Sequence, residues 1–174
     1  NKVSGIVILY DTNGVTLSQS RYTDNVLNGF MKMYNSDGSL ISVTPYLDGK
    51  QHGVAKTYHK NGMISVQTPY SNGKINGVKK TFYDNGKIQS VQEISNGIGN
   101  GVYNFFDIYG NIQIEYIESN GKKNGEQKIY DHGMLSISTI YEDGKKHGVE
   151  KIYSKNQLLM ETSYIDDKKN GIEK

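Results

Sequence analysis

Glycine recurs along this chain at a fixed interval. The first set begins each repeat and is spaced by 23 or 24 residues; it comprises Gly5, Gly29, Gly53, Gly77, Gly101, Gly125, Gly148 and Gly171. A second set follows by eight or nine residues, and a third set precedes the next first-set glycine by four. A short fixed period of this kind indicates a repeat architecture. The sequence therefore predicts a single repeat domain over residues 1–174, with seven repeats and the opening of an eighth.

Aromatic and aliphatic residues follow the same period. The first aromatic column lies five residues after a first-set glycine and comprises Tyr10, Tyr34, Tyr58, Phe82, Phe106, Tyr130 and Tyr153. A second column lies near the end of the repeat and comprises Tyr22, Tyr46, Tyr70, Tyr141 and Tyr164. An aliphatic column, which includes Leu40 and Ile64, lies between them. The repeat is thus built from two short apolar runs.

The turn residues between these runs predict β-hairpins. Asn-Gly and Asp-Gly pairs stand within repeats, as at Asn61-Gly62, and between repeats, as at Asp48-Gly49. Such pairs are a strong hairpin signal because glycine adopts positive φ without strain. Three glycines per repeat would each destabilise a helix by about 1 kcal/mol. We therefore expect an all-β fold, an elongated solenoid-like antiparallel meander of stacked β-hairpins with about seven 23–24-residue repeats.

The spacing of the apolar positions also predicts which face of the sheet they occupy. In the third repeat, Val54, Tyr58, Ile64, Val66 and Tyr70 all lie at odd distances from Gly53. They share one face if the inner loop holds three residues and ends in glycine. Both aromatic columns would then form one aromatic-lined concave face. Pro45 and Pro69 cannot donate to a ladder, so the second strand is expected to stop pairing or to bulge there.

Catalytic and metal-binding chemistry has no support in the residue pattern. Cysteine is absent, and no recognised hydrolase, zinc-protease or phosphate-loop motif occurs. His52 and His147 occupy a column that Asn fills in other repeats, which favours a turn role. The net charge of +2 gives no reason to expect nucleic acid, and no apolar run is long enough to span a membrane. We expect no enzyme activity, no cofactor and no metal site.

A lysine column supplies the candidate binding residues. Lysine recurs three residues after the first-set glycine, two residues before the first aromatic column. The predicted partner-binding residues are Lys32, Lys56, Lys80, Lys128, Lys151, Tyr34, Tyr58, Phe82, Phe106, Tyr130 and Tyr153. A ladder of cations beside aromatic rings suits an acidic protein, a polyanionic glycan or a lipid head group. Ordinary surface solvation, with lysine stems covering the rings, explains the same pattern and stays open.

The repeat unit resembles a known family. The segment 72–87, Asn-Gly-Lys-Ile-Asn-Gly-Val-Lys-Lys-Thr-Phe-Tyr-Asp-Asn-Gly-Lys, is similar to the bacterial variant of the MORN repeat. This resemblance implies a scaffold, and proteins of this type are often labelled YwqK-family antitoxins. It points to a non-catalytic protein-binding module, with a toxin or a host or cell-surface protein as partner, in the bacterial cytoplasm if it is an antitoxin. The alternatives are an exported or surface repeat region, if the precursor carries a signal peptide, and a module that binds acidic lipid or glycan. We also expect self-association through the sheet ends.

Overall fold

The computed structural model describes residues 2–171, and the chain falls into two compact units. Unit 1 is Asn1–Lys87 and unit 2 is Ile88–Lys174. Each unit contains only β-strands and turns in its described part, and the strand pairs are antiparallel. The predicted all-β meander of hairpins is therefore confirmed within each unit. The expectation of one domain over 1–174 stays a prediction.

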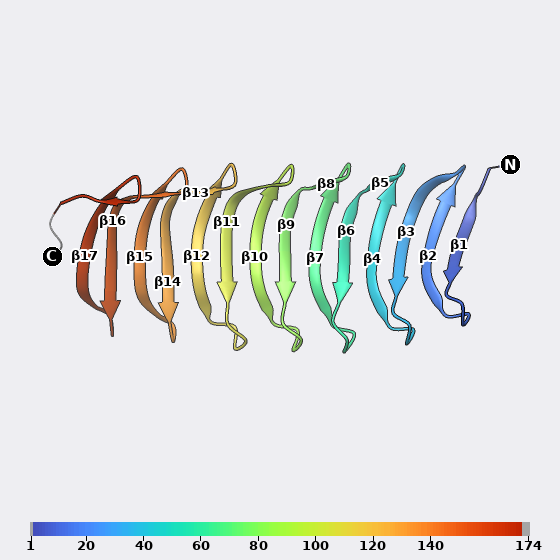
Figure 1. The fold of residues 1–174 in the computed structure, drawn as a ribbon, viewed down its shortest axis with the longest axis horizontal. Coiled ribbons are helices and arrows are strands. Elements are labelled where there is room, and N and C mark those ends of the chain that lie inside the picture. Colours follow the sequence, from blue (N-terminus) through green and yellow to red (C-terminus); the bar gives the residue numbers. More distant parts are fainter. Residues whose placement is uncertain (1, 172–174) are drawn as a thin grey trace. The chain divides into compact units, whose positions relative to one another are not determined.

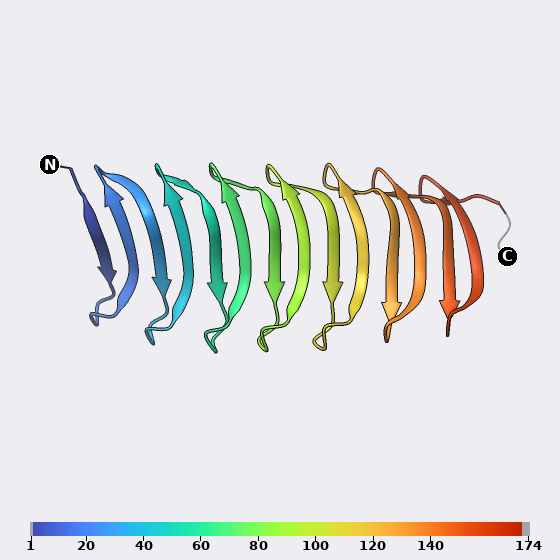
Figure 2. The same cartoon turned by 180° about the vertical axis from the view of Figure 1, so that it is seen from behind.

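The strands of unit 1 follow one another side by side in chain order (Figures 1 and 2). They are β1 (Gly5–Tyr10), β2 (Thr16–Thr23), β3 (Val26–Tyr34), β4 (Leu40–Leu47), β5 (Lys50–Gln51), β6 (Gly53–Tyr58), β7 (Ile64–Ser71), β8 (Lys74–Ile75) and β9 (Gly77–Phe82). Each two-residue strand continues directly into a longer one, so β5–β6 and β8–β9 act as single interrupted strands. The repeat therefore contributes one hairpin, as the turn signals predict.

Unit 2 repeats the same arrangement. Its strands are β10 (Ile88–Ser95), β11 (Ile98–Phe106), β12 (Ile112–Ser119), β13 (Lys122–Lys123), β14 (Gly125–Asp131), β15 (Met134–Glu142), β16 (Lys145–Ser154), β17 (Gln157–Ile165) and β18 (Lys168–Lys169). β12 pairs with both β13 and β14, which again form one interrupted strand.

The inner turns have the predicted three-residue loop in the first five repeats. In the third repeat, the Gly62 N–H donates to the His59 carbonyl at 2.9 Å, and the His59 N–H donates to the Met63 carbonyl at 2.8 Å. Gly62 has φ of 82°. This is a type I turn followed by a glycine bulge. The two shorter repeats instead use two-residue turns with positive φ at both positions, and Asn156 (φ 65°) takes the place of glycine.

The outer turns, which join one repeat to the next, are two-residue turns of type I′. Asp48 and Gly49 have φ of 49° and 75°. Positive φ at both central residues matches the twist of the flanking strands. The residue four positions after Asp48 is His52, whose N–H donates to the Pro45 carbonyl at 3.0 Å. His52 therefore lies just after the turn, in the break between β5 and β6, and not in the turn itself.

A break in pairing follows each outer turn, and the first-set glycine lies in it. Gly77 has φ of 120°, and a Cβ at this position would lie 3.2 Å from Cγ of Pro69. The bulge predicted at Pro45 and Pro69 is confirmed, but it recurs where other residues fill the proline position. Ile140 packs against Gly148 in the same way. The bulge therefore belongs to the repeat, and proline is tolerated because the ladder is already open there.

A second bulge corrects the predicted face assignment. In the third repeat Thr57 lies opposite Val66, but the next residue, Tyr58, lies opposite Ile64. Ser65 is therefore an extra residue, and its hydroxyl lies 2.7 Å from that of Thr57. Because one extra residue reverses the alternation of side chains, Tyr58 and Tyr70 lie on opposite faces. The prediction of one face carrying both aromatic columns is wrong.

Two faces can now be named for each unit. The lysine face carries the residues one, three and five positions after a first-set glycine, together with those opposite them; in β6 these are Val54, Lys56 and Tyr58. The glycine face carries the first-set glycine and the second aromatic column, as at Gly53 and its opposite residue Tyr70.

Neither unit has a deep core in its described part. Ile94, at 9% exposure, is the buried hydrophobic residue, and Ser20, Gln127, Ser138, Thr139 and Thr162 are buried polar residues. Such thin packing fits repeats in which each hairpin contacts only its neighbours. Most large side chains are consequently left partly exposed, and they provide the surface on which a site can be built.

Candidate partner-binding surface

Three rows of side chains cross the lysine face of unit 1. The central row joins residues that lie opposite one another on successive strands: Ile8, Gln19, Lys32, Val43, Lys56, Gln67 and Lys80. Lysine thus recurs on β3, β6 and β9, and a neutral residue separates each lysine from the next. Strand pairing, and not sequence proximity, aligns these cations.

A mainly apolar row flanks the central row on each side, with Thr16 and Arg21 as polar members. The inner row, next to the inner turns, contains Tyr10, Thr16, Tyr34, Leu40, Tyr58, Ile64 and Phe82. The outer row contains Ile6, Arg21, Phe30, Pro45, Val54, Pro69 and Val78. Ile6 is 61% exposed and Phe30 is 58% exposed. A line of cations therefore lies between two lines of accessible hydrophobic surface.

Acidic residues are absent from every strand of unit 1. Unit 1 carries ten Lys and Arg residues against five Asp and no Glu, a formal charge of +5; unit 2 carries ten Lys against thirteen Asp and Glu, a formal charge of −3. Within residues 2–171, no carboxylate lies within ion-pair distance of Lys32, Lys56 or Lys80. The near-neutral total charge conceals this asymmetry.

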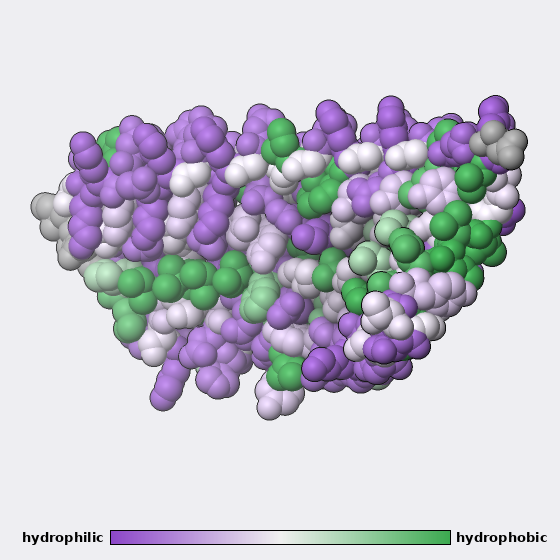
Figure 3. All heavy atoms as spheres, turned by 45° about the vertical axis from the view of Figure 1, so that its right-hand side comes forward, coloured by the Kyte–Doolittle hydropathy of each residue, from purple (hydrophilic) through white to green (hydrophobic). Residues whose placement is uncertain are grey.

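The lysine face is hollowed around Gln19, the residue opposite Lys32. One hollow, of about 140 Å³, is lined by outer-row residues Ile6, Arg21 and Phe30 and by Lys32. A second, of about 360 Å³, is lined by Ile8 and by inner-row residues such as Tyr34. Gln19 borders both hollows, so they lie on either side of the central row. Figure 3, which brings the N-terminal end forward, shows hydrophobic side chains gathered at this end.

The lysines on the corresponding face of unit 2 are paired. Lys128 Nζ lies 3.4 Å from Glu115 Oε1 and 3.6 Å from Glu126 Oε2, and Lys151 Nζ lies 3.4 Å from Glu161 Oε1. The charges of Glu126 and Glu115 raise the pKa of Lys128. Burial and the hydrogen bond that its hydroxyl donates to Glu115 raise the pKa of Tyr130 to about 12. Lys128 and Lys151 are thus neutralised within unit 2.

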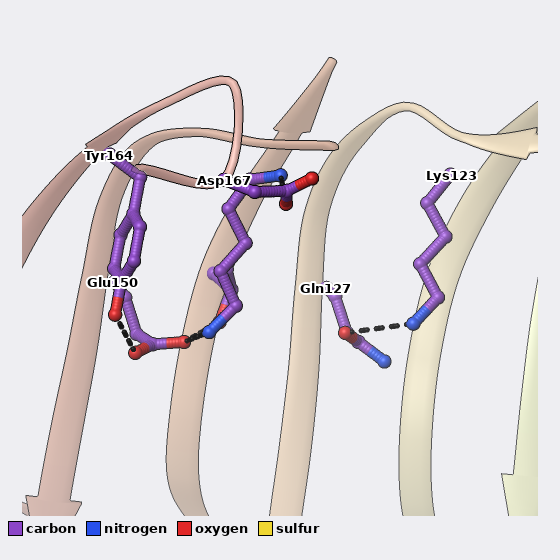
Figure 4. Close-up of polar contacts among 7 residues, drawn as sticks. Lys123, Gln127, Glu150, Tyr164 and Asp167 are labelled. Atoms are coloured by element: carbon purple, nitrogen blue, oxygen red, sulfur yellow. Dashed lines mark hydrogen bonds and ion pairs between the residues drawn. The ribbon is translucent and has the colours of Figure 1, made fainter. Parts of the chain in front are cut away.

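The glycine face of unit 2 holds a different set of polar contacts (Figure 4). Lys146 forms an ion pair with Glu150, which also accepts hydrogen bonds from Thr139 Oγ1 at 3.0 Å and from the Tyr164 hydroxyl at 3.3 Å. The Lys146 ammonium also lies 4.8 Å from the centroid of the Tyr164 ring. Burial opposes ionisation of Glu150, but the bonds from Lys146 and Thr139 hold its pKa below the ordinary value.

Lys123 occupies the equivalent place one repeat earlier. Its ammonium lies 4.9 Å from the Tyr116 ring centroid and 5.0 Å from that of Tyr141, and it donates to Gln127 Oε1 at 3.1 Å. Burial lowers the pKa of Lys123, and Glu118 opposes this shift. Tyr116 also stacks on Tyr103, with ring centroids 4.6 Å apart. These contacts join side chains of neighbouring repeats and stabilise unit 2.

The structure brings the predicted binding residues together on one face but divides them by charge. All eleven lie on the lysine face of their own unit, and Lys32, Lys56 and Lys80 are the unneutralised members. Sequence reasoning missed Phe30, Val54 and Val78, which form the outer row. It also missed the contacts that Lys123 and Lys146 make with tyrosine rings of the glycine face. Their signal was a second lysine in the pairs Lys122-Lys123, Lys145-Lys146 and Lys168-Lys169.

Neither a metal cluster nor a membrane-spanning helix is found in the part of the chain that the structure describes. Across residues 2–171, His, Asp and Glu side chains do not gather in threes as metal ligands. The described residues also include no helix with the length and apolar character needed to cross a bilayer.

Comparison with protein families defines part of the repeat array. Residues 51–72 and 75–96 each match the family model described as the MORN repeat variant. These two consecutive segments are MORN-type repeats, and their boundaries agree with the glycine period. The comparison with curated proteins gives no significant match.

Proposed function

We propose that this chain is a non-catalytic repeat scaffold that binds a protein partner through the lysine face of unit 1. The observation that carries this proposal is the central row, in which three cations without carboxylate partners lie between two apolar rows. Apolar side chains supply buried contact area, and charged side chains steer the partner and set its register. MORN-type repeats at residues 51–96 support a scaffold role.

Within this class, we favour a partner that the scaffold neutralises, as an antitoxin or immunity protein neutralises a toxin. The resemblance of residues 72–87 to antitoxin-type repeats supports this choice. An exported or surface-attached array that contacts a host or neighbouring cell would use the same face. The two roles differ in compartment and partner identity but not in the chemistry of the surface.

Site-specific photo-crosslinking in the source cell tests the proposed face. The photoreactive amino acid p-benzoylphenylalanine replaces either Phe30, on the lysine face, or Met33, on the glycine face of the same strand. The two native side chains are 58% and 43% exposed, so accessibility is closely matched. We expect the Phe30 position to give one reproducible protein adduct, identified by mass spectrometry, that the Met33 position does not give.

The adduct must also depend on charge. Lys56→Glu together with Lys80→Glu should abolish the Phe30 adduct, whereas Lys128→Glu together with Lys151→Glu should retain it, because those lysines are already paired. Equal adducts from both strand positions, or no protein adduct from either, would refute the proposal.

A module that binds anionic lipid is the second candidate, because cations between apolar rows also suit a charged membrane surface. Flotation with phosphatidylserine-containing vesicles tests it. Lipid binding predicts salt-sensitive flotation that Lys56→Glu with Lys80→Glu removes. Absence of flotation at low salt would exclude this function.

A further inference from the structure

The geometry of the central row points to a particular kind of partner segment. Resting on the proposed function, we infer that the lysine face of unit 1 takes an acidic polyproline II segment, with a carboxylate at every third residue, laid across the strands. Lys32, Lys56 and Lys80 would each bind one carboxylate, and the inner and outer rows would contact the residues between them.

The three lysines recur at a regular interval across the sheet. Lys32, Lys56 and Lys80 lie on every second full-length strand of the sheet, since β3, β6 and β9 are separated by β4 and β7. Neighbouring strands are about 4.8 Å apart, so successive lysines are about 9.6 Å apart across the sheet. A polyproline II helix advances about 9.3 Å per three-residue turn. Its every third side chain therefore projects on one side at nearly the same interval as the lysines.

The inner and outer rows provide contact surfaces for the other side chains of such a segment. In a three-residue turn, two side chains remain besides the carboxylate, and they point to either side of the line of acids. The two hollows lie on either side of the central row, one at Ile6 and Phe30 and one at Ile8 and Tyr34. Aromatic and apolar surfaces of this kind suit proline rings. The lysines thus fit a ligand with a period of three, and the two hollows beside Gln19 would take the flanking side chains of one of its turns.

Other conformations fit less well. In a β-strand, residues three apart point to opposite faces, so a strand laid across the row presents its acids to alternate sides. Two turns of an α-helix advance about 10.8 Å, so its side chains return to one side at an interval that differs more from the lysine spacing of about 9.6 Å than that of polyproline II does. A second copy of this chain offers Glu115, Glu126 and Glu161, but these are already paired with lysines.

Titration with synthetic peptides tests the inference on the whole chain. The probe is (Pro-Pro-Glu)5, and the matched control has the same composition with its five glutamates in one block. A second control, (Pro-Pro-Gln)5, keeps the period without the charge. We expect the periodic acidic peptide to bind at least tenfold more tightly than either control by isothermal titration calorimetry, with affinity falling as salt rises.

Matched protein variants locate the binding. Lys32→Glu, Lys56→Glu and Lys80→Glu together should lower affinity for (Pro-Pro-Glu)5 at least tenfold. Lys60→Glu, Lys74→Glu and Lys79→Glu change the unit's charge by the same amount away from the central row and should retain binding within about threefold. Circular dichroism confirms that both variants stay folded. Equal binding of the periodic and block peptides, or equal loss in both triple variants, would overturn the inference.

The outcomes separate this inference from the proposed function. Failure of the periodic peptide with a persistent Phe30 adduct would reject the polyproline II segment and leave a protein partner of another shape. Flotation with anionic vesicles, or dimers in which Phe30 crosslinks to a second copy, would reject it in favour of a lipid or self-association. Loss of the Phe30 adduct itself would reject the proposed function as well.

Discussion

At the residue scale, equivalent positions of the repeat are used differently in the two units. In unit 2, Lys123 and Lys146 lie opposite residues of the glycine face and contact tyrosine rings. Gln51 and Ile75 occupy these places in unit 1, opposite Tyr46 and Tyr70. In unit 2, Lys123 and Lys146 therefore make contacts within the protein. In unit 1, the lysines without carboxylate partners lie on the lysine face.

Glu150 provides a test of the internal contacts. Its carboxylate pairs with Lys146 and accepts hydrogen bonds from Thr139 and Tyr164, so Glu150→Gln should destabilise unit 2 by about 1.5–3 kcal/mol, the typical value of hydrogen bonds to a charged group. Urea denaturation at pH 7 measures this loss. Lys155→Gln, at an exposed turn, is the control and should change stability little.

The lowered pKa of Glu150 also fixes the direction of a pH effect. Because the folded-state pKa lies below the ordinary value of 4.5, this stabilisation is complete above pH 4.5 and is lost as pH falls through the folded-state value. The difference in stability between the parent and Glu150→Gln should therefore shrink between pH 6 and pH 3. A difference that stays constant over this range would contradict the role of the ionised carboxylate.

Gly77 tests the break after the outer turn. Its φ of 120° lies in a region that favours glycine, and an added Cβ would lie 3.2 Å from Pro69. Gly77→Ala should destabilise unit 1 by about 1–3 kcal/mol, the usual energy of such backbone strain. Combining it with Pro69→Ala should recover part of the loss, because the contact with the proline ring disappears. No recovery in the thermal midpoint would show that backbone strain alone accounts for the effect.

At the element scale, the turns could be predicted from sequence and the inner bulge could not. Asn-Gly and Asp-Gly pairs identify the hairpins because positive φ restricts the choice of residue. The extra residue of the inner bulge has no such restriction; Leu17, Ile41, Ser65, Gln113 and Ser136 occupy it in different repeats. A bulged residue near the right-handed helical conformation suits almost any side chain. The sequence-based prediction therefore placed the apolar side chains of the second strand, beyond the bulge, on the wrong face of the sheet.

The same limit applies to the binding surface. The lysine and first aromatic columns are two residues apart on one strand, so their common face follows from sequence alone. Their neutralisation in unit 2 does not, because Glu115 and Glu161 reach Lys128 and Lys151 from neighbouring strands. The face of Phe30 and Val54 follows from the same alternation, but the alignment of Phe30 with Pro45 in one row needs the strand pairing.

Strand β1 tests the expected self-association. Within the described residues it pairs only with β2, and all six of its residues are exposed, including Leu9 at 60%. An exposed apolar edge strand is a template for pairing with another chain. We expect concentration-dependent association of the parent in sedimentation velocity experiments, reduced by Leu9→Lys. Ile117→Lys, at 52% exposure on β12, which pairs with β11 on one side and with β13 and β14 on the other, should leave it unchanged. A parent that stays monomeric at all concentrations would contradict this prediction.

At the scale of the whole molecule, the two units differ in net charge more than in their backbone structure. Unit 1 has a formal charge of +5 and unit 2 of −3, although both are built from the same hairpin. Because repeats of this type contact mainly their neighbours, a change in one unit is expected to act mainly within that unit. Unit 2 can therefore be neutral on its lysine face without affecting the cations of unit 1.

Local stability should follow this division. Glu150→Gln is expected to accelerate amide hydrogen exchange in β14–β17 and to leave β1–β7 unchanged, because the lost bonds all lie in unit 2. Mass spectrometry of exchanged peptides measures both regions in one sample. Accelerated exchange over the whole chain would indicate a single cooperative unit.

The most direct test of the central claim neutralises the lysines of unit 1 without removing them. Gln19 lies opposite Lys32, and Gln67 lies opposite both Lys56 and Lys80. Gln19→Glu with Gln67→Glu, which change charge at nearly constant size, would give each lysine a carboxylate neighbour as in unit 2. The measurement is the yield of the protein adduct from p-benzoylphenylalanine at position 30. Loss of that adduct is the predicted result, and an undiminished yield would contradict the claim that the unpaired lysines bind the partner.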